Sequence, residues 1–421
     1  MSTALDPRPA PAGGAPQDPD TGATGLSGAA ALRTVVGMEL RQRLRSRGWY
    51  VLLGLFFLLV GVVTLGALGL RAISAGDMAG MSAAHQETVL RTAGQWMFDG
   101  VLMFTLTLAL LVAPALAANA ISGDRAGGTL AITQVTLLST GQLMAGKWLA
   151  AWIASAAFVA AALPWLAVAA VVGRVSPLYV LVGILMILVE FAVVTGIGVA
   201  VSAIAGRTLF AVVVTYLLVA MLCIGSVVAL VLSLQFMSVP VRASQPEYAS
   251  AQETLSEEQM ASMSDEDWNA YDAEQARQFP EAFDQVADAC VGPVTDQEVP
   301  DGRRVAWLVA PNPFMVVADA SPWIVPPATG STTTPAPGAG PLNGLSAVYR
   351  QAQRDPRASV ECLDGELRRL DPSAMPDREG TWPMWPLGLA MQGALTAGLL
   401  WWGHRRLDTP AGRLASGTRV A

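Results

Sequence analysis

Residues 119–147 read NAISGDRAGGTLAITQVTLLSTGQLMAGK and connect two long apolar runs. The first part of this stretch is polar, and the pair Gly127-Gly128 favours a break in any helix there. The sequence TLAITQVTLLST that follows predicts a short amphipathic helix, and Ser139-x-x-Gln142 predicts a capping box that opens another helix. We therefore predict a helix, a break and a helix between the two apolar runs.

The composition indicates a membrane protein. Hydrophobic residues make up 53% of the 421 residues and charged residues only 14%, whereas a water-soluble domain carries about 25% charged residues. Six apolar runs approach the roughly 20 residues that a membrane-spanning helix needs. They lie at about residues 49–70, 96–118, 148–172, 178–203, 209–234 and 382–402. We therefore predict an all-α polytopic membrane protein with six transmembrane helices.

Lys and Arg in the short loops predict the orientation, because cytoplasmic loops carry an excess of both. One side carries Arg33, Arg41, Arg43, Arg45, Arg47, Arg125, Lys147, Arg207, Arg405, Arg406 and Arg413. The short loops of the other side carry only Arg71, Arg91 and Arg174. We expect both termini in the cytoplasm, a plasma-membrane location and a cytoplasmic loop at 120–147.

The chain then divides into parts. Residues 1–28 have the composition of a disordered tail. Residues 29–48 predict a basic amphipathic helix on the inner leaflet, with a plain arginine cluster that sets topology as the alternative. Spans one to five occupy 49–234, an external domain 235–380, and the sixth span 381–403. Residues 404–421 form a second cytoplasmic tail.

The predicted external domain holds 23 acidic and ten basic residues. Its acidic first half and residues 345–370 look helical, and a Pro/Gly/Thr tract lies between them, so we predict a mainly helical domain. An acidic surface of this kind is most simply a solvated one. Cys290 and Cys362 are the only cysteines outside the spans, in a compartment that permits disulfides. We expect them to be paired; two free thiols are the alternative.

The sequence predicts no catalytic residues, no metal site, no bound cofactor and no nucleic-acid partner. GQLMAGKW, residues 141–148, resembles a phosphate-binding loop, but Trp148 replaces the Ser or Thr that would hold magnesium, and no strand precedes it. Glu190 lies near the middle of the fourth span, where a carboxyl is costly. It is a candidate for lining a substrate path or relaying a proton, or it is a protonated acid bonded to a neighbouring helix.

The stretch ISGDRAGGTLAITQVTLLSTGQLMAGKWLAAW, residues 121–152, resembles the signature of ABC-2 type transporter permeases. In that family an acidic-basic pair follows span two, then Gly-Thr-Leu, a short helix, and Gly-Lys at span three. The matching positions are Asp124, Arg125, Gly128, Thr129, Leu130, Gly146 and Lys147. Gly198 and Ser202 resemble the family's turn between spans four and five, and residues 312–320 resemble its Pro-Phe stretch.

The resemblance implies a permease subunit, not itself an enzyme, of an exporter. Two copies, or one copy and a paralogue, would pair in the lipid bilayer with separate cytoplasmic ABC ATPase subunits that bind ATP and Mg. A coupling helix at about 124–139 would seat in the ATPase through Asp124, Arg125, Gly128, Thr129, Leu130, Val135 and Leu138. Two alternatives are a membrane anchor whose external domain binds an extracellular partner, and a membrane-embedded enzyme.

Overall fold

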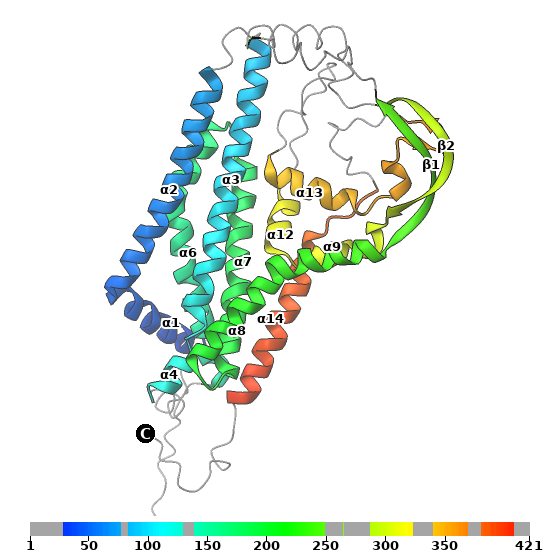
Figure 1. The fold of residues 1–421 in the computed structure, drawn as a ribbon. Helices are drawn as coiled ribbons and strands as arrows, with labels where there is room; N and C mark the ends of the chain where they lie inside the picture. Colours follow the sequence, from blue (N-terminus) through cyan, green and yellow to red (C-terminus); the bar gives the residue numbers. More distant parts are fainter. Residues whose placement is uncertain are drawn as a thin grey trace, which may run out of the picture.

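The computed structural model describes residues 28–76, 83–128, 139–248, 264, 287–322, 340–368 and 380–407, and these are mostly helical. Long helices form a bundle, and a smaller mixed region lies beside its upper half (Figure 1). The bundle helices are α1 (Gly28–Arg45), α2 (Arg47–Gly76), α3 (Ala83–Ala117), α6 (Thr140–Val172), α7 (Pro177–Ile204), α8 (Thr208–Ala220), α9 (Ser226–Phe236) and α14 (Trp385–Leu407). A π-helical turn, η1 (Met221–Gly225), joins α8 to α9.

Five helical stretches are long and apolar enough to cross a membrane: 47–73, 90–126, 140–172, 177–204 and 208–236. They correspond to the first five predicted spans, and several run longer than the apolar runs alone indicated. The predicted sixth span forms α14, but the polar Gln392 and four glycines dilute its apolar content. The assignment of α14 as a sixth span therefore stays a prediction.

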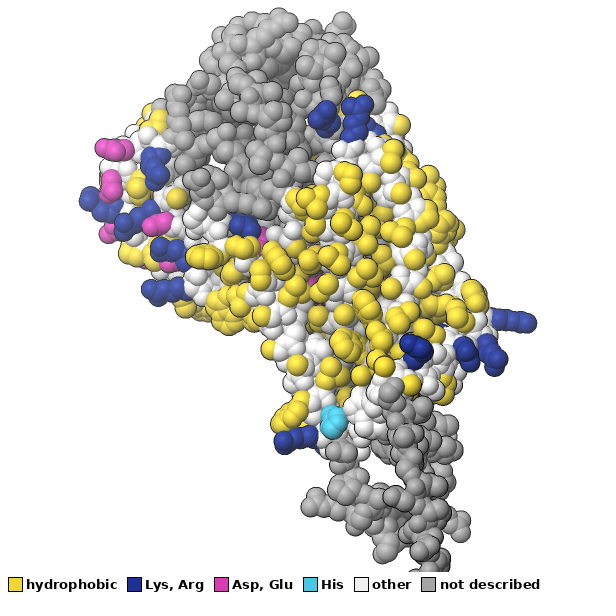
Figure 2. All heavy atoms as spheres, turned by 180° about the vertical axis from the view of Figure 1, so that it is seen from behind, with side chains coloured by type: hydrophobic (Ala, Val, Ile, Leu, Met, Phe, Trp, Pro, Cys, Tyr) yellow, Lys and Arg dark blue, Asp and Glu magenta, His cyan; other side chains and the backbone are white. Residues whose placement is uncertain are grey.

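The outer surface of the bundle suits lipid. Large apolar side chains are exposed on α2, on α8 and on α9, including Leu58, Leu209 and Phe236. Figure 2, seen from the opposite side, shows an apolar surface on the bundle with Lys and Arg side chains gathered near its upper and lower edges. The side chains that fill the interior, such as Phe98 and Phe158, are buried. The chain is thus a multi-pass membrane protein, with α7 at the centre of the bundle against α3, α6 and α14.

Residues 237–384, here called the insert, separate α9 from α14, and their described parts contain a sheet that the prediction of a mainly helical domain did not include. A four-stranded sheet runs in the order β2-β1-β3-β4. The strands are β1 (Ser238–Tyr248), β2 (Ala287–Pro300), β3 (Cys362–Leu363) and β4 (Glu366–Leu367). β1 pairs antiparallel with β2, with Ser238 opposite Pro300, and Ala243 pairs with Leu363 of β3.

Residues 345–370, which we predicted to be helical, contain the end of one helix and a hairpin. The helix is α13 (Pro341–Gln351), followed by the 3₁₀ turn η4 (Pro356–Ser359). The hairpin turn between β3 and β4 is Asp364-Gly365, and both residues have positive φ. An Asp-Gly pair favours this mirror-image turn because glycine adopts positive φ without strain. The acidic 249–263 and 265–286, the tract at 323–339, and the tails 1–27 and 408–421 lie outside the described residues.

Two carboxylates fasten the insert to the bundle. Asp99 of α3 accepts a hydrogen bond from the Leu342 amide at 3.2 Å, near the start of α13. Asp319 of α12 (Pro313–Ala320) accepts bonds from the Met384 and Trp385 amides, at 2.7 and 3.2 Å, where α14 begins. Free amides at a helix start favour an acceptor carboxylate. Each carboxylate therefore holds the first turn of a helix that is distant in the sequence.

Candidate functional site

The first backbone amides of the short helix α4 (Ser122–Ala126) donate hydrogen bonds to a hydroxyl of another helix. Ser202, near the end of α7, accepts backbone hydrogen bonds from Ile121 at 3.0 Å and Ser122 at 2.9 Å. These amides have no partner within α4, so the Ser202 oxygen takes the role of an N-cap side chain supplied from outside. Gly198, one turn earlier on α7, allows the close approach, because a Cβ there would lie 2.6 Å from the Ala117 side chain.

Arg125 binds the same, C-terminal end of α7. Its guanidinium donates to the Ala205 carbonyl at 2.7 Å and to the Ala203 carbonyl at 3.3 Å. Arg406 of α14 donates to the carbonyl between them, that of Ile204, at 3.2 Å. The last carbonyls of a helix carry partial negative charge, so two guanidinium groups stabilise this terminus. Arg125 is thereby fixed to α7.

Asp124 is held by a buried lysine. The Lys147 ammonium of α6 lies 2.6 Å from the Asp124 carboxylate and also pairs with Glu39 of α1. The Lys147 side chain is only 2% exposed. The helix α1 covers Lys147 and supplies the second acid. Burial without such partners would be prohibitive for an ammonium group.

The helix α1 lies directly on α6 at this point. A Cβ on Gly146 would lie 2.6 Å from Val35 of α1, so only glycine permits the contact. The buried positions of α1 are Ala31, Val35 and Glu39. Arg43, on the next turn of this face, donates a hydrogen bond to the Leu116 carbonyl at 3.0 Å. Burial lowers the pKa of the Arg43 guanidinium below its usual value.

We call Glu39, Asp124, Arg125, Lys147 and Ser202 the α4 cluster. It joins α1, α4, α6 and α7 at the end of the bundle opposite the insert. The chain leaves the cluster at Gly128, which has φ +71°, and returns at Ser139. There the predicted capping box is confirmed: Ser139 Oγ accepts from the Gln142 amide at 3.2 Å, and Gln142 Oε1 accepts from the Ser139 amide at 3.0 Å. Thr129, Leu130, Val135 and Leu138 lie outside the described residues.

A comparison with protein-family models matches residues 33–281 to a family described as ABC-2 family transporter protein. The match covers more than half of the chain and includes every residue of the α4 cluster. The chain is an ABC-2 family transporter protein. A search of curated proteins finds no match. The resemblance in the signature stretch is therefore confirmed, and membership identifies this ABC-2 chain as a membrane subunit of a transporter.

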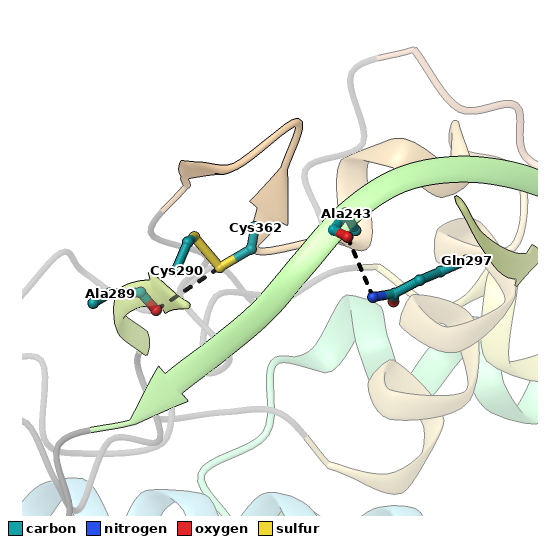
Figure 3. The surroundings of a disulfide bond; sticks show 5 residues. All are labelled: Ala243, Ala289, Cys290, Gln297 and Cys362. Atoms are coloured by element: carbon teal, nitrogen blue, oxygen red, sulfur yellow. Dashed lines mark hydrogen bonds between the residues drawn. A yellow bond between two sulfur atoms is a disulfide. The ribbon is translucent and has the colours of Figure 1, made fainter. Parts of the chain in front are cut away.

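The other predicted site residues of the ABC-2 chain lie away from the α4 cluster. Glu190 is 1% exposed, and its Oε2 accepts from Gln392 of α14 at 3.2 Å. The predicted disulfide between Cys290 and Cys362 is present and ties β2 to β3 (Figure 3). Sequence reasoning did not identify Glu39, Asp99 or Gln392. Glu39 carried one signal, because it is the only acid in the strongly basic α1.

Proposed function

We propose that this ABC-2 protein is the membrane-spanning permease of an exporter, driven by separate cytoplasmic ATPase subunits that bind ATP and Mg²⁺. Residues 124–139 would be the coupling segment that docks on an ATPase. Family membership supports the permease class. The arginine asymmetry supports cytoplasmic termini in the plasma membrane, and the resemblance supports export and pairing with a second copy or a paralogue.

The α4 cluster is the observation that carries the coupling proposal. Asp124 and Arg125 begin the segment, and their side chains are bonded to α6 and to α7. Lys147 extends the same contacts to Glu39 of α1. Because packed interiors transmit displacement rather than absorb it, a push on the segment would reach three bundle helices together. That is the requirement for a mechanical link between ATP hydrolysis and the spans.

The docking step is tested by charge substitutions in the segment. Leu130→Asp and Val135→Arg are each expected to leave the chain folded in the membrane and to abolish co-purification of the ATPase. An unpaired charge at a small interface should lower the affinity by more than about a hundredfold. Val291→Arg is the matched control, because Val291 is exposed on β2 in the insert. If both segment variants retain the ATPase, the proposed docking role is wrong.

The transmission step is tested separately by Arg125→Ala. This change removes the bonds to the Ala203 and Ala205 carbonyls but leaves the apolar part of the segment intact. We expect the ATPase to remain bound while its hydrolysis rate no longer responds to the permease. Arg207→Ala is the control, because Arg207 is an exposed arginine near the same end of α7. Equal coupling in the two variants would contradict the role of the α4 cluster.

The direction of transport is tested with the same two variants in cells. Untargeted mass analysis of the cell contents should find a compound that accumulates with Arg125→Ala and not with Arg207→Ala. Accumulation is expected because a failed exporter retains its substrate. Depletion of that compound would indicate import.

A further inference from the structure

A second polar site lies in the middle of the bundle, where α7, α14 and the chain before α12 meet. Gln392 of α14 is fully buried beside Glu190 of α7. Its Nε2 donates to Glu190 Oε2 at 3.2 Å and to the Pro311 carbonyl at 3.0 Å. One amide therefore connects two bundle helices to the insert. The α4 cluster takes no part in these contacts.

The Pro311 carbonyl determines which way the Gln392 amide faces. A carbonyl oxygen only accepts, so the amide must present its nitrogen to it, and the reversed amide would place two oxygens face to face. Both hydrogens of Nε2 are then used, one on Pro311 and one on Glu190. The amide oxygen Oε1 can only accept, and it needs a donor.

Two buried oxygens at this site lack such a donor. In the described parts of the chain, neither Gln392 Oε1 nor Glu190 Oε1 has a hydrogen-bond partner. An ionised Glu190 offers only acceptors, so it could not donate a hydrogen bond to Gln392 Oε1. Its own Oε1 would also stay without a partner. A proton on Glu190 Oε1 changes that atom into a donor, which can serve the Gln392 oxygen. A single proton thus accounts for both unpaired atoms.

We infer that Glu190 binds a proton in this conformation and shares it with the Gln392 oxygen, which makes the packing of α14 on α7 depend on protonation. When α14 separates from α7, water reaches the carboxyl, which releases its proton to that water and becomes a carboxylate. The carboxylate then resists the return of α14, because it would be buried without a donor. Lower pH therefore favours the closed packing.

Few groups near Glu190 could stabilise its ionised form in place of the proton. The Cys223 thiol of η1 lies within electrostatic range of it. The other charged groups on the elements packed against α7 have partners or lie at the ends of their helices. Among these groups are Asp99 with Tyr179, Lys147 with Asp124 and Glu39, Asp319 with Arg350, Arg91 near the start of α3, and His404, Arg405 and Arg406 at the last turn of α14. Within the described residues, no Lys, Arg or His forms an ion pair with Glu190.

The first test is the thermal unfolding of the full-length protein in lipid nanodiscs as a function of pH. Glu190→Gln supplies an amide donor at every pH, so it should remove a pH dependence that the native chain shows. The native chain should lose about tenfold in its folded-to-unfolded ratio per pH unit while the folded state alone holds the proton. Glu298→Gln, an exposed change on β2, is the matched control and should behave as native.

The second test identifies the species. Infrared difference spectra should show a protonated carboxylic-acid carbonyl at neutral pH that Glu190→Gln removes and Glu298→Gln retains. Gln392→Leu should keep the pH dependence of unfolding, because Glu190 stays buried and burial favours its protonated form. It should shift the acid carbonyl band, because it removes the shared acceptor. The inference is overturned if that carbonyl is absent, if Gln392→Leu leaves its frequency unchanged, or if sodium or potassium shifts unfolding at fixed pH. None of these readouts uses the ATPase, so they stand or fall separately from the proposed coupling.

Discussion

Lys147 of α6 and Asp124 of α4 form a 2.6 Å ion pair that joins the two ends of the loop between them. The loop begins where α4 ends at Ala126 and stops where α6 begins at Thr140. The pair therefore closes the base of the proposed coupling segment. Because Lys147 also pairs with Glu39, the base is attached to α1 as well.

Removal of the lysine should destabilise the protein strongly. Lys147→Leu removes the buried ammonium that Glu39 and Asp124 share, and the loss of one member of a buried ion pair costs about 3–5 kcal/mol. Thermal unfolding followed by tryptophan fluorescence would measure the loss. Arg41→Leu is the control, because Arg41 is exposed on α1. A loss no larger than that of the control would show that the ion pairs contribute little to stability.

Replacement of Asp319 should destabilise the insert about as much as replacement of Lys147 destabilises the protein. Its side chain is 1% exposed, and it binds the Arg350 guanidinium at 2.9 Å as well as the first amides of α14. Asp319→Asn leaves Arg350 buried without a counter-charge, so we expect a loss of about 3–5 kcal/mol. Limited proteolysis should report early opening of the insert.

Asp355→Asn is the control for Asp319→Asn. Asp355 is 54% exposed and lies 3.7 Å from Arg303, also at the surface. Surface pairs contribute about 0–1 kcal/mol, so this variant should resist protease like the native chain. Equal resistance of the Asp319 variant would contradict the stabilising role of the Asp319 contacts.

The disulfide should stabilise the insert through its long loop. The sequence separation of Cys290 and Cys362 is 72 residues, and closing a loop of that size stabilises the fold by about 4 kcal/mol in the chain-entropy model. Replacement of both cysteines by serine should lower the unfolding temperature, whereas Cys223→Ser should leave it nearly unchanged. Equal mobility of the folded native protein on reducing and non-reducing gels would argue against the bond.

The orientation can be tested by labelling in intact cells. In a Cys223→Ser background that keeps the disulfide, single cysteines at Ser27 and Gly412 should resist an impermeant thiol reagent, and one at Thr332 should react. The expectation rests on the arginine asymmetry of the short loops. Labelling of Ser27→Cys would reverse the orientation.

Local patterns in the sequence predicted much of the fold. The first five apolar runs became helices because length and hydropathy suffice to specify a membrane-spanning helix. The capping box at Ser139 depends on two residues three positions apart, so the sequence also predicted it correctly. The Asp364-Gly365 pair also indicates a turn, which our prediction of a helix there did not include. It would have predicted a hairpin in place of part of a helix.

The contacts of the two polar sites could not be predicted in this way. Glu39 and Lys147 are 108 positions apart, and Glu190 and Gln392 are 202 apart. A single sequence gives each of these residues many candidate partners. Only the packing of α1 on α6 and of α14 on α7 selects among them. The resemblance indicated that Asp124, Arg125, Lys147 and Ser202 matter, but not that they bond to neighbouring helices.

The contacts of Asp319 also constrain the order in which the chain can mature. The ribosome makes α12 and α13 before α14, yet Asp319 receives two of its bonds from amides at the start of α14. Asp99 of α3 is synthesised much earlier, and it can accept its bond from the Leu342 amide only after α13 has been made. The insert can therefore complete its packing only after the last helix has left the ribosome and docked beside α7. Chains truncated before Trp385 should leave this region open to quality-control proteases, however complete the sheet is.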